Sequence, residues 1–134
     1  MFPVLLLLAG AAFTAPVALT AATGYELSKN PETMGAYVRE YFEDEPIMAD
    51  IAWCESRFRH VGPDGEIFRG KVNDQDIGVM QINTRYHQAR AEGMGIDIYS
   101  LEGNLEYAKF LYEKQGTKPW NSSKPCWGKY AVAK

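Results

Sequence analysis

Hydrophobic residues after position 30 recur at intervals of three and four, which is the spacing of one face of an α-helix. This pattern predicts a helix over residues 31–43, where Asn30-Pro31-Glu32 supplies an N-cap, a proline in the first turn and an acid. The pattern restarts after Asp44-Glu45-Pro46 and predicts a second helix over about 46–57. The apolar face of this second helix is broad, and Glu55 continues it, which is unusual for a carboxylate.

Two more helices are predicted further along the chain. Asn83 is suited to cap a short helix that runs through Glu92. Ser100 is suited to cap the longest helix, over about 101–115, which Gly116 would end. The residues of this long helix that are expected to face inward are Leu101, Leu105, Ala108, Leu111 and Tyr112.

Residues 58–76, between the helices, are rich in turn formers. Gly62-Pro63-Asp64-Gly65 separates residues 58–61 from 66–69, which predicts a β-hairpin with a four-residue turn. The tail at 119–127 is aromatic, and we expect it to be irregular. The predicted fold class is therefore mainly α (α+β), with about four to five helices and one small β-hairpin.

The first 24 residues indicate the compartment. They contain no Asp, Glu, Lys or Arg, and residues 4–9 are strongly apolar, as in the central region of a secretory signal. We expect a signal peptide at 1–22, cut after Ala22, followed by one domain at 23–134. An uncleaved N-terminal anchor is the alternative, because about 20 apolar residues can span a bilayer. The protein is expected to be exported, that is, secreted, periplasmic or associated with the cell envelope. Contact with the membrane is expected only if the leader remains uncleaved.

Length and charge limit the number of domains and the classes of ligand. A length of 134 residues allows one domain, and a formal net charge of −3 gives no case for nucleic-acid binding. The charge is uneven, with an acidic stretch at 25–50 and a lysine-rich stretch from 114 to the end. This distribution predicts two solvated surfaces of opposite sign. We expect a monomer.

The two cysteines, Cys54 and Cys126, both lie in the part expected to be exported. An oxidising compartment favours a disulfide between them, and two separate buried thiols are the alternative. The bond would close a loop of about 70 residues, worth on the order of 4 kcal/mol in the chain-entropy account.

Candidate chemistry begins with the carboxylates. Glycosidic cleavage needs a carboxyl group that is still protonated near neutrality and can protonate the leaving oxygen. Glu55, on an apolar helix face beside Trp53, is the first candidate, because desolvation raises the pKa of a carboxyl group. The alternative from placement alone is a glutamate at a helix end that faces solvent. Asp76 is the first candidate for a second carboxylate, and Asp74 is the next.

Three sequence segments are more specific. Glu55-Ser56-Arg57-Phe58 resembles the E-S-x-F end of the catalytic helix in the lysozyme-like superfamily. Residues 76–83, Asp-Ile-Gly-Val-Met-Gln-Ile-Asn, resemble the D-x-G-x-M-Q-I-N segment of C-type lysozymes and of small lytic transglycosylases from secretion and pilus systems. Asn104-Leu105, with Ala108 and Leu111, is similar to the N-I-x-x-G/A-x-x-L helix of the soluble lytic transglycosylase domain. The resemblance covers about residues 46–127.

The resemblance implies a lysozyme-like fold with a glycan-binding cleft. It assigns the general acid to Glu55 and the second carboxylate to Asp76. The other residues expected on the cleft are Ser56, Gly78, Gln81, Asn83, Asn104 and Trp120. Trp120 or Trp127 could stack on a sugar or form a wall beside Glu55, and structural packing is the alternative for each. The apolar residues of these segments are expected to belong to the core: Met80, Ile82 and Leu105.

The function implied by the resemblance is that of a peptidoglycan lytic transglycosylase, which cleaves the MurNAc–GlcNAc β-1,4 bond and leaves a 1,6-anhydro product. The alternatives are a lysozyme that uses water at the same site, and a non-catalytic glycan-binding or regulatory module. No cofactor and no metal are implied. The implied partner is the glycan strand of peptidoglycan, and a secretion or pilus system is a further candidate.

Two departures from the family pattern bear on the product. Many lytic transglycosylases have an A-Y-N-A-G segment, and this chain has Trp120-Asn121-Ser122-Ser123 in its place. C-type lysozymes have four disulfides, whereas the two cysteines of this chain can form only one. The helix that contains Asn104 resembles the transglycosylase domain more closely. The 1,6-anhydro product is therefore the favoured expectation.

Overall fold

The computed structural model describes residues 31–132. The expected signal peptide at 1–22 and its cleavage site lie outside the described residues. Within residues 31–132, no helix is both long enough and apolar enough to span a membrane.

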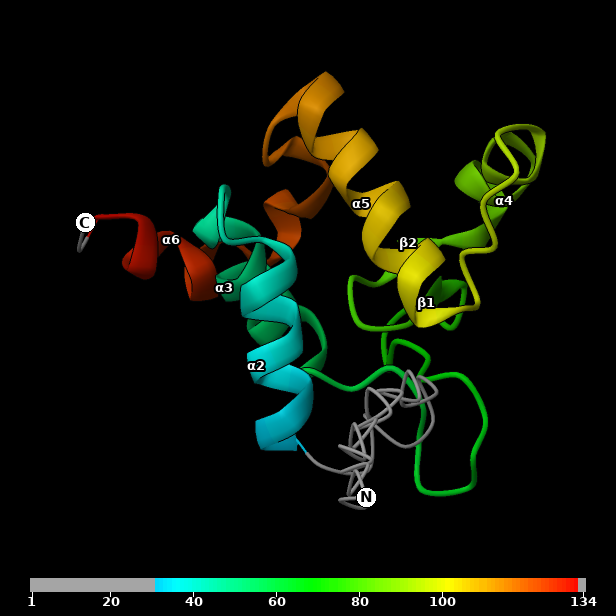
Figure 1. Ribbon diagram of the computed structural model, residues 1–134, viewed down its shortest axis with the longest axis horizontal. Helices are drawn as coiled ribbons and strands as arrows, with labels where there is room; N and C mark the ends of the chain where they lie inside the picture. The colour runs from blue at the N-terminus through cyan, green and yellow to red at the C-terminus, as the bar shows by residue number, and fades with distance from the viewer. Residues whose placement is uncertain (1–30, 133–134) are drawn as a thin grey trace, which may run out of the picture.

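The described chain is mainly helical with one small antiparallel sheet, as the sequence predicted (Figure 1). The elements in order are α2 (Pro31–Tyr41), α3 (Pro46–Ser56), β1 (Asp76–Ile77), β2 (Ile82–Asn83), α4 (Thr84–Gly93), α5 (Leu101–Gln115), the 3-10 helix η1 (Lys118–Ser123) and α6 (Lys124–Val132). Two of the three predicted caps are confirmed, and the third, Asn30, lies outside the described residues. The Asn83 side chain accepts a hydrogen bond from the Tyr86 amide, and Ser100 accepts one from the Gly103 amide.

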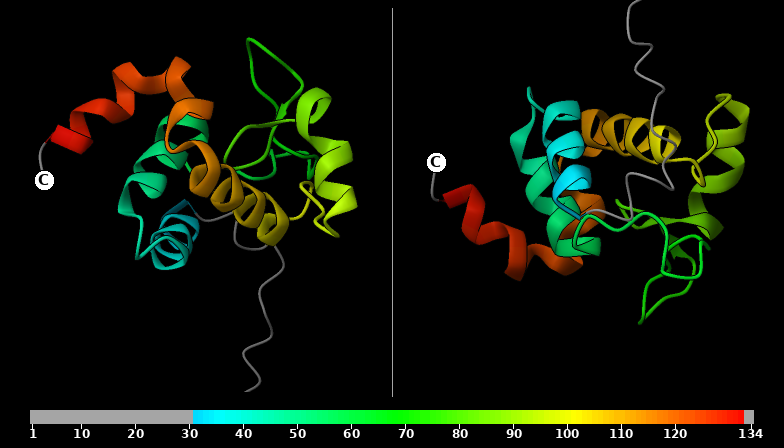
Figure 2. Two further views of the ribbon diagram at one scale, coloured as in Figure 1. Left: turned by 90° about the horizontal axis from the view of Figure 1, so that it is seen from above. Right: turned by 60° about the horizontal axis from the view of Figure 1, so that its bottom comes forward.

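Helix α5 runs between two groups of elements (Figures 1 and 2). Helices α2, α3 and α6 lie on one side of it, and the sheet with α4 lies on the other. The inward residues predicted for α5 are confirmed, because Leu101, Leu105, Ala108 and Leu111 are buried and Tyr112 packs partly buried against the core. The two groups are thus joined through one shared core.

The predicted hairpin at 58–69 is present next to its turn and is a correction only in its extent. Val61 pairs with Ile67, the Gly62 amide donates to the Glu66 carbonyl oxygen, and the Phe68 amide donates to the His60 carbonyl oxygen. The two strands lie further along the chain, where β1 and β2 pair Asp76 with Asn83 and Ile77 with Ile82. Phe58 does not belong to the expected first strand, because its backbone is left-handed, with φ of 59°. This backbone conformation carries the Phe58 ring into the core.

The tail is a second correction, because residues 118–132 are helical. Pro119 lies at the start of η1 and Pro125 lies in the first turn of α6, where a missing N–H costs no helical hydrogen bond. The aromatic residues of the tail, Trp120 and Trp127, are buried. The prolines of the tail therefore lie at the starts of helices, and its tryptophans pack these helices against the core.

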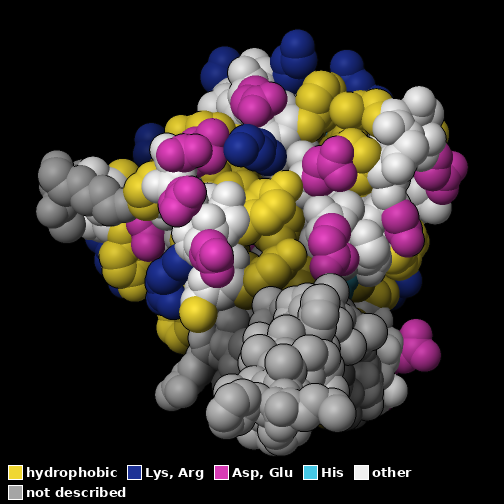
Figure 3. Space-filling view, viewed as in Figure 1, with side chains coloured by type: hydrophobic (Ala, Val, Ile, Leu, Met, Phe, Trp, Pro, Cys, Tyr) yellow, Lys and Arg dark blue, Asp and Glu magenta, His cyan; other side chains and the backbone are white. Residues whose placement is uncertain are grey.

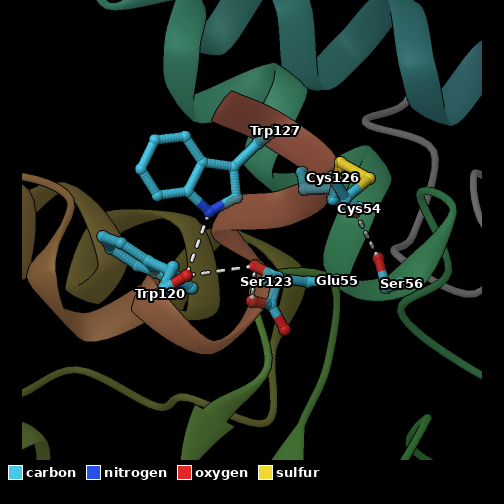
Figure 4. Close-up of a disulfide and its surroundings, with 8 residues drawn as sticks. Cys54, Glu55, Ser56, Trp120, Ser123, Cys126 and Trp127 are labelled. Atoms are coloured by element: carbon cyan, nitrogen blue, oxygen red, sulfur yellow. Dashed lines mark hydrogen bonds between the residues drawn. A yellow bond between two sulfur atoms is a disulfide. The ribbon is translucent and has the colours of Figure 1, made fainter. Parts of the chain in front are cut away.

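The predicted disulfide is confirmed. Cys54 and Cys126 are bonded, with 5.8 Å between their Cα atoms. The bond joins the last turn of α3 to the first turn of α6. It therefore fixes the end of α3, where Glu55 lies, against the C-terminal segment (Figure 4).

Candidate functional site

Glu55 lies in the last turn of α3 and is partly buried. Its Oε1 is 2.5 Å from the Ser123 hydroxyl, which comes from the end of η1. Figure 4 shows Ser123 between Glu55 and the carbonyl group of Trp120, and the distance from Ser123 Oγ to that carbonyl oxygen is 3.1 Å. The carboxyl group is therefore held by a hydroxyl from a distant part of the chain.

The environment of Glu55 raises its pKa. Burial is the largest cause, because it disfavours the charged form. The hydrogen bond with Ser123 acts in the opposite direction, and the negative charge of Asp76 raises the pKa again. More of this carboxyl group is therefore protonated near neutral pH than of an ordinary exposed glutamate.

Asp76 is positioned by the sheet. It begins β1 opposite Asn83 in β2, and Asn83 Nδ2 donates to Asp76 Oδ1 at 2.8 Å. Asn83 also caps α4 through its side-chain oxygen, so a single residue orients both the carboxylate and the helix. Asp76 and Glu55 line the same two hollows, and the negative charge of Asp76 is one cause of the raised pKa of Glu55.

Two hollows meet at these carboxyl groups. The small hollow, of about 90 Å³, extends toward His87, Leu111 and Pro119. The large hollow, of about 630 Å³, extends along residues 56–59 and 70–73. Both are lined by Glu55, Asp76, Gln81 and Ser122. Together the hollows form one cleft that extends to both sides of the carboxyl pair.

The backbone around the cleft is strained. Arg57, Phe58 and Gln81 are the non-glycine residues with positive φ in the described part of the chain, at 56°, 59° and 51°. Such conformations cost of order 1–3 kcal/mol each and persist where the surrounding structure requires them. Arg57 and Gln81 line the cleft, and Gln81 is held there by a hydrogen bond from its Nε2 to the Gly78 carbonyl oxygen.

Four of the predicted site residues line the cleft with at least partial exposure: Glu55, Asp76, Gln81 and Asn83. Ser56 also borders the large hollow, but its side chain is buried, and its Oγ lies 2.8 Å from the Val79 carbonyl oxygen. Ser56 therefore joins α3 to the segment between the strands, which keeps Glu55 and Asp76 in one site.

Asn104 is a correction, because its side chain is completely buried and does not face the cleft. Its Oδ1 accepts from the Met80 amide at 2.9 Å, and its Nδ2 lies 3.1 Å from the Ile77 oxygen and 3.0 Å from the Ile98 oxygen. All these partners are backbone groups: one in β1, one in the β1–β2 connection and one between α4 and α5. Asn104 thus fastens the β1–β2 connection to α5.

Gly78 is a related correction. Its φ is 73°, and a Cβ atom there would lie 2.6 Å from Asn104 Nδ2 and 2.8 Å from the His60 ring. The close approach that requires glycine is therefore to Asn104 and His60 rather than to a sugar. The core assignment is confirmed for Met80, Ile82 and Leu105, which are all buried.

Both candidate tryptophans are packed. Trp120 is 2% exposed, and its indole N–H donates to the Met80 carbonyl oxygen at 2.9 Å. The indole N–H of Trp127 donates to the Trp120 carbonyl oxygen at 3.0 Å. Neither ring presents an open face for stacking on a sugar, so the packing alternative is the one observed. Trp120 borders the small hollow as part of its wall.

Sequence reasoning missed Ser123. It lies 68 residues from Glu55 along the chain, and a serine at a helix end has no distinctive pattern. One signal was available, namely that Trp120-Asn121-Ser122-Ser123 departs from the A-Y-N-A-G segment of the enzymes that the sequence resembles. The basic residues of the large hollow, Arg57, Arg59 and Lys71, were also not identified as site residues.

No family model, curated protein or solved structure matches the chain. Within residues 31–132, no group of three or more His, Cys, Asp or Glu side chains is placed to hold a metal ion.

Proposed function

We propose that this protein is a lytic transglycosylase of the lysozyme-like superfamily, which cleaves the MurNAc–GlcNAc β-1,4 bond of peptidoglycan. The observation that carries the proposal is Glu55, a partly buried carboxyl group with a raised pKa that lines, together with a second carboxylate, a cleft extending to both sides of the pair. A glycan strand needs such an open cleft, because it continues beyond the cleaved bond in both directions.

In the proposed reaction, Glu55 gives its proton to the glycosidic oxygen as the bond from this oxygen to C1 of MurNAc breaks. The bonding electrons leave with the oxygen, which becomes the 4-hydroxyl group of GlcNAc. The 6-hydroxyl oxygen of MurNAc then bonds to C1 and returns a proton to the Glu55 carboxylate. Glu55 is acid in the first step and base in the second, and the product is a 1,6-anhydro sugar.

Asp76 supports the first step electrostatically. Positive charge develops on the sugar ring as the bond to C1 breaks, and a carboxylate in the same cleft stabilises it. The hydrogen bond from Asn83 fixes the orientation of Asp76 before substrate binds, so little reorganisation is needed.

A lysozyme is the second candidate, and the presence of Asp76 beside Glu55 is the observation that favours it. In that reaction Asp76 would attack C1, and water would complete the hydrolysis. The disulfide between Cys54 and Cys126 supports the proposed export of either enzyme, because such bonds persist in oxidising compartments.

The product decides between the two reactions. We expect mass spectrometry of digested peptidoglycan to give 1,6-anhydro muropeptides, which are lighter than their hydrated counterparts by one water, about 18 Da. Hydrated reducing ends alone would identify a lysozyme. Binding to insoluble peptidoglycan without release of any fragment would identify a non-catalytic module.

A further inference from the structure

The cleft is electrically uneven along its length. The lysine and arginine side chains that line it in the described part of the chain all lie in the large hollow: Arg57, Arg59 and Lys71. The small hollow is lined by none. A ligand that spans the cleft therefore meets acidic groups at its centre and basic groups at one end.

Two of these cations are held in position. Arg59 Nε donates to the Ser56 carbonyl oxygen at 2.8 Å, and its guanidinium lies over the Phe68 ring at 4.3 Å. The Arg57 guanidinium lies over the Trp53 ring at 4.6 Å. Aromatic contacts of this kind restrict a guanidinium without neutralising it. The two arginines are thus arranged for a ligand before it binds.

The strained turn after α3 places them there. Arg57 and Phe58 both have left-handed backbone, and this geometry buries the Phe58 ring while Arg57 and Arg59, on either side of it, remain exposed. An unstrained continuation of the helix would instead point these three residues in directions about 100° apart. The turn is therefore what brings the two arginines to the same hollow.

The charges of these three cations are not neutralised by an ion pair within the described part of the chain. Among the described residues, no carboxylate lies within ion-pair distance of Arg57, Arg59 or Lys71. Acidic side chains lie instead along α2 and α5 on the face shown in Figure 3. The positive charge of the large hollow is thus available to an anionic ligand.

We propose that the large hollow binds the peptide stem of a muramyl unit, with its carboxylate groups held by Arg57, Arg59 and Lys71. The inference rests on the proposed function. The sugars of the strand offer hydroxyl and acetamide groups, whereas the stem offers carboxylates beside short alkyl groups. Val72, which is fully exposed at the rim of the same hollow, supplies an apolar contact for these alkyl groups. The enzyme is then selective for strands that retain their stems.

The experiment compares two substrates and two matched double variants. The substrates are glycan strands with intact stems and the same strands after an amidase has removed the stems. Arg57→Gln/Lys71→Gln removes two cations from the large hollow. The control, Arg85→Gln/Lys129→Gln, removes two exposed cations that line neither hollow. Arg59 is left intact because it also bonds the Ser56 backbone.

We expect the hollow variant to lower kcat/KM on stem-bearing strands by about 3- to 20-fold, since two exposed ion pairs are lost. On stem-free strands the loss should be smaller by about threefold or more, and the control should stay within about twofold on both substrates. Equal losses on the two substrates, no loss on either, or the same loss in the control would overturn the inference.

A binding measurement separates this inference from the proposed function. A soluble muramyl pentapeptide is titrated into the protein while NMR chemical shifts are recorded. We expect shifts at Arg57, Arg59 and Lys71 that the hollow variant weakens. If the protein cleaves strands but the peptide shifts none of these residues, the inference fails and the function stands. If the peptide binds there but neither substrate is cleaved, the function fails and the peptide site stands.

Discussion

Ser123 Oγ lies 2.5 Å from Glu55 Oε1 and 3.1 Å from the Trp120 carbonyl oxygen. A hydroxyl group has one proton to donate, whereas a carbonyl oxygen and an ionised carboxylate can only accept. Both contacts are hydrogen bonds at once only when Glu55 is protonated and donates to Ser123, which then donates to Trp120. When Glu55 loses its proton, the Ser123 hydroxyl can rotate and donate to the carboxylate. Ser123 can therefore hold Glu55 in both the acid and the base step of the proposed reaction.

Ser123→Ala should lower kcat/KM by roughly 10- to 100-fold, the range for a hydrogen bond to a charged group. The pKa of Glu55 should rise further, because the bond to Ser123 lowers it at present. The alkaline limb of the pH–rate profile should move to higher pH, since Glu55 must be protonated to act as the acid. Ser123→Thr, which keeps the hydroxyl group, should restore the wild-type profile. An unchanged profile in the alanine variant would show that Ser123 does not act on Glu55.

Glu55→Gln should remove essentially all cleavage, because the amide is nearly isosteric but has no acidic proton. General acid catalysis alone is worth about 10²–10⁴-fold in rate. Release of soluble fragments from purified peptidoglycan measures the loss, and circular dichroism reports on folding. Activity within a few-fold of wild type would contradict the assignment of the acid.

The same variant should be more stable than wild type at neutral pH. The pKa of Glu55 is raised in the folded protein, so the folded state binds this proton more tightly than the unfolded state does. Wild-type stability is therefore lost as the pH rises from the usual glutamate pKa of 4.5 through the raised pKa of the folded state. A glutamine at this position does not titrate, so the variant does not lose stability in this way as the pH rises. The difference in Tm between the two proteins should be present at pH 7 and shrink below about pH 4.

The sequence was informative where structure is decided locally. Asn83 and Ser100 could be recognised as caps because each bonds an amide only three residues away. Helix α5 could be predicted because its inward residues follow one period. Glu55 was identifiable because it interrupts an apolar face.

Other features depend on contacts between distant segments. The hairpin at 58–69 pairs only next to its turn, because Phe58 is buried in the core. The two strands form where Asn104 bonds the backbone of β1 and of the β1–β2 connection. From the sequence, the side-chain amide of Asn104 could form hydrogen bonds with a glycan or with backbone groups of the protein. Only its burial in the folded structure decides between these roles. Ser123 reaches Glu55 because the tail folds as a helix and is bonded to α3 through Cys126.

Asn104→Ala should lower the free energy of unfolding by roughly 3–5 kcal/mol, because it leaves buried backbone groups at Ile77, Met80 and Ile98 without partners. Chemical denaturation measures the change. Asn121→Ala, at an exposed position in η1, is the matched control and should change stability by no more than about 0.5 kcal/mol. If both variants were equally stable, the bonds of Asn104 would not hold the sheet against α5.

Cys54→Ser/Cys126→Ser should lower stability by roughly 2–4 kcal/mol, since the bond restricts a long loop in the unfolded chain. Activity should fall as well at temperatures where the variant remains folded, because the bond holds the end of α3 beside Ser123. Thermal denaturation and fragment release, each compared with reduced wild-type protein, measure the two effects. Full activity in a destabilised variant would mean that helix packing alone aligns Glu55 with Ser123.

Asp76→Asn tests which reaction the carboxyl pair performs. If Asp76 acts only through its charge, the variant should be slower by about 10- to 1000-fold and should still release 1,6-anhydro products. The pKa of Glu55 should fall, because Asp76 raises it at present, and the alkaline limb of the pH–rate profile should move to lower pH. If Asp76 is instead the nucleophile, the amide cannot form the covalent intermediate, and cleavage should stop altogether. Mass spectrometry of the residual products, together with the pH profile, separates the two cases. Complete loss in the variant, with only hydrated reducing ends from wild type, would establish the lysozyme reaction in place of the proposed one.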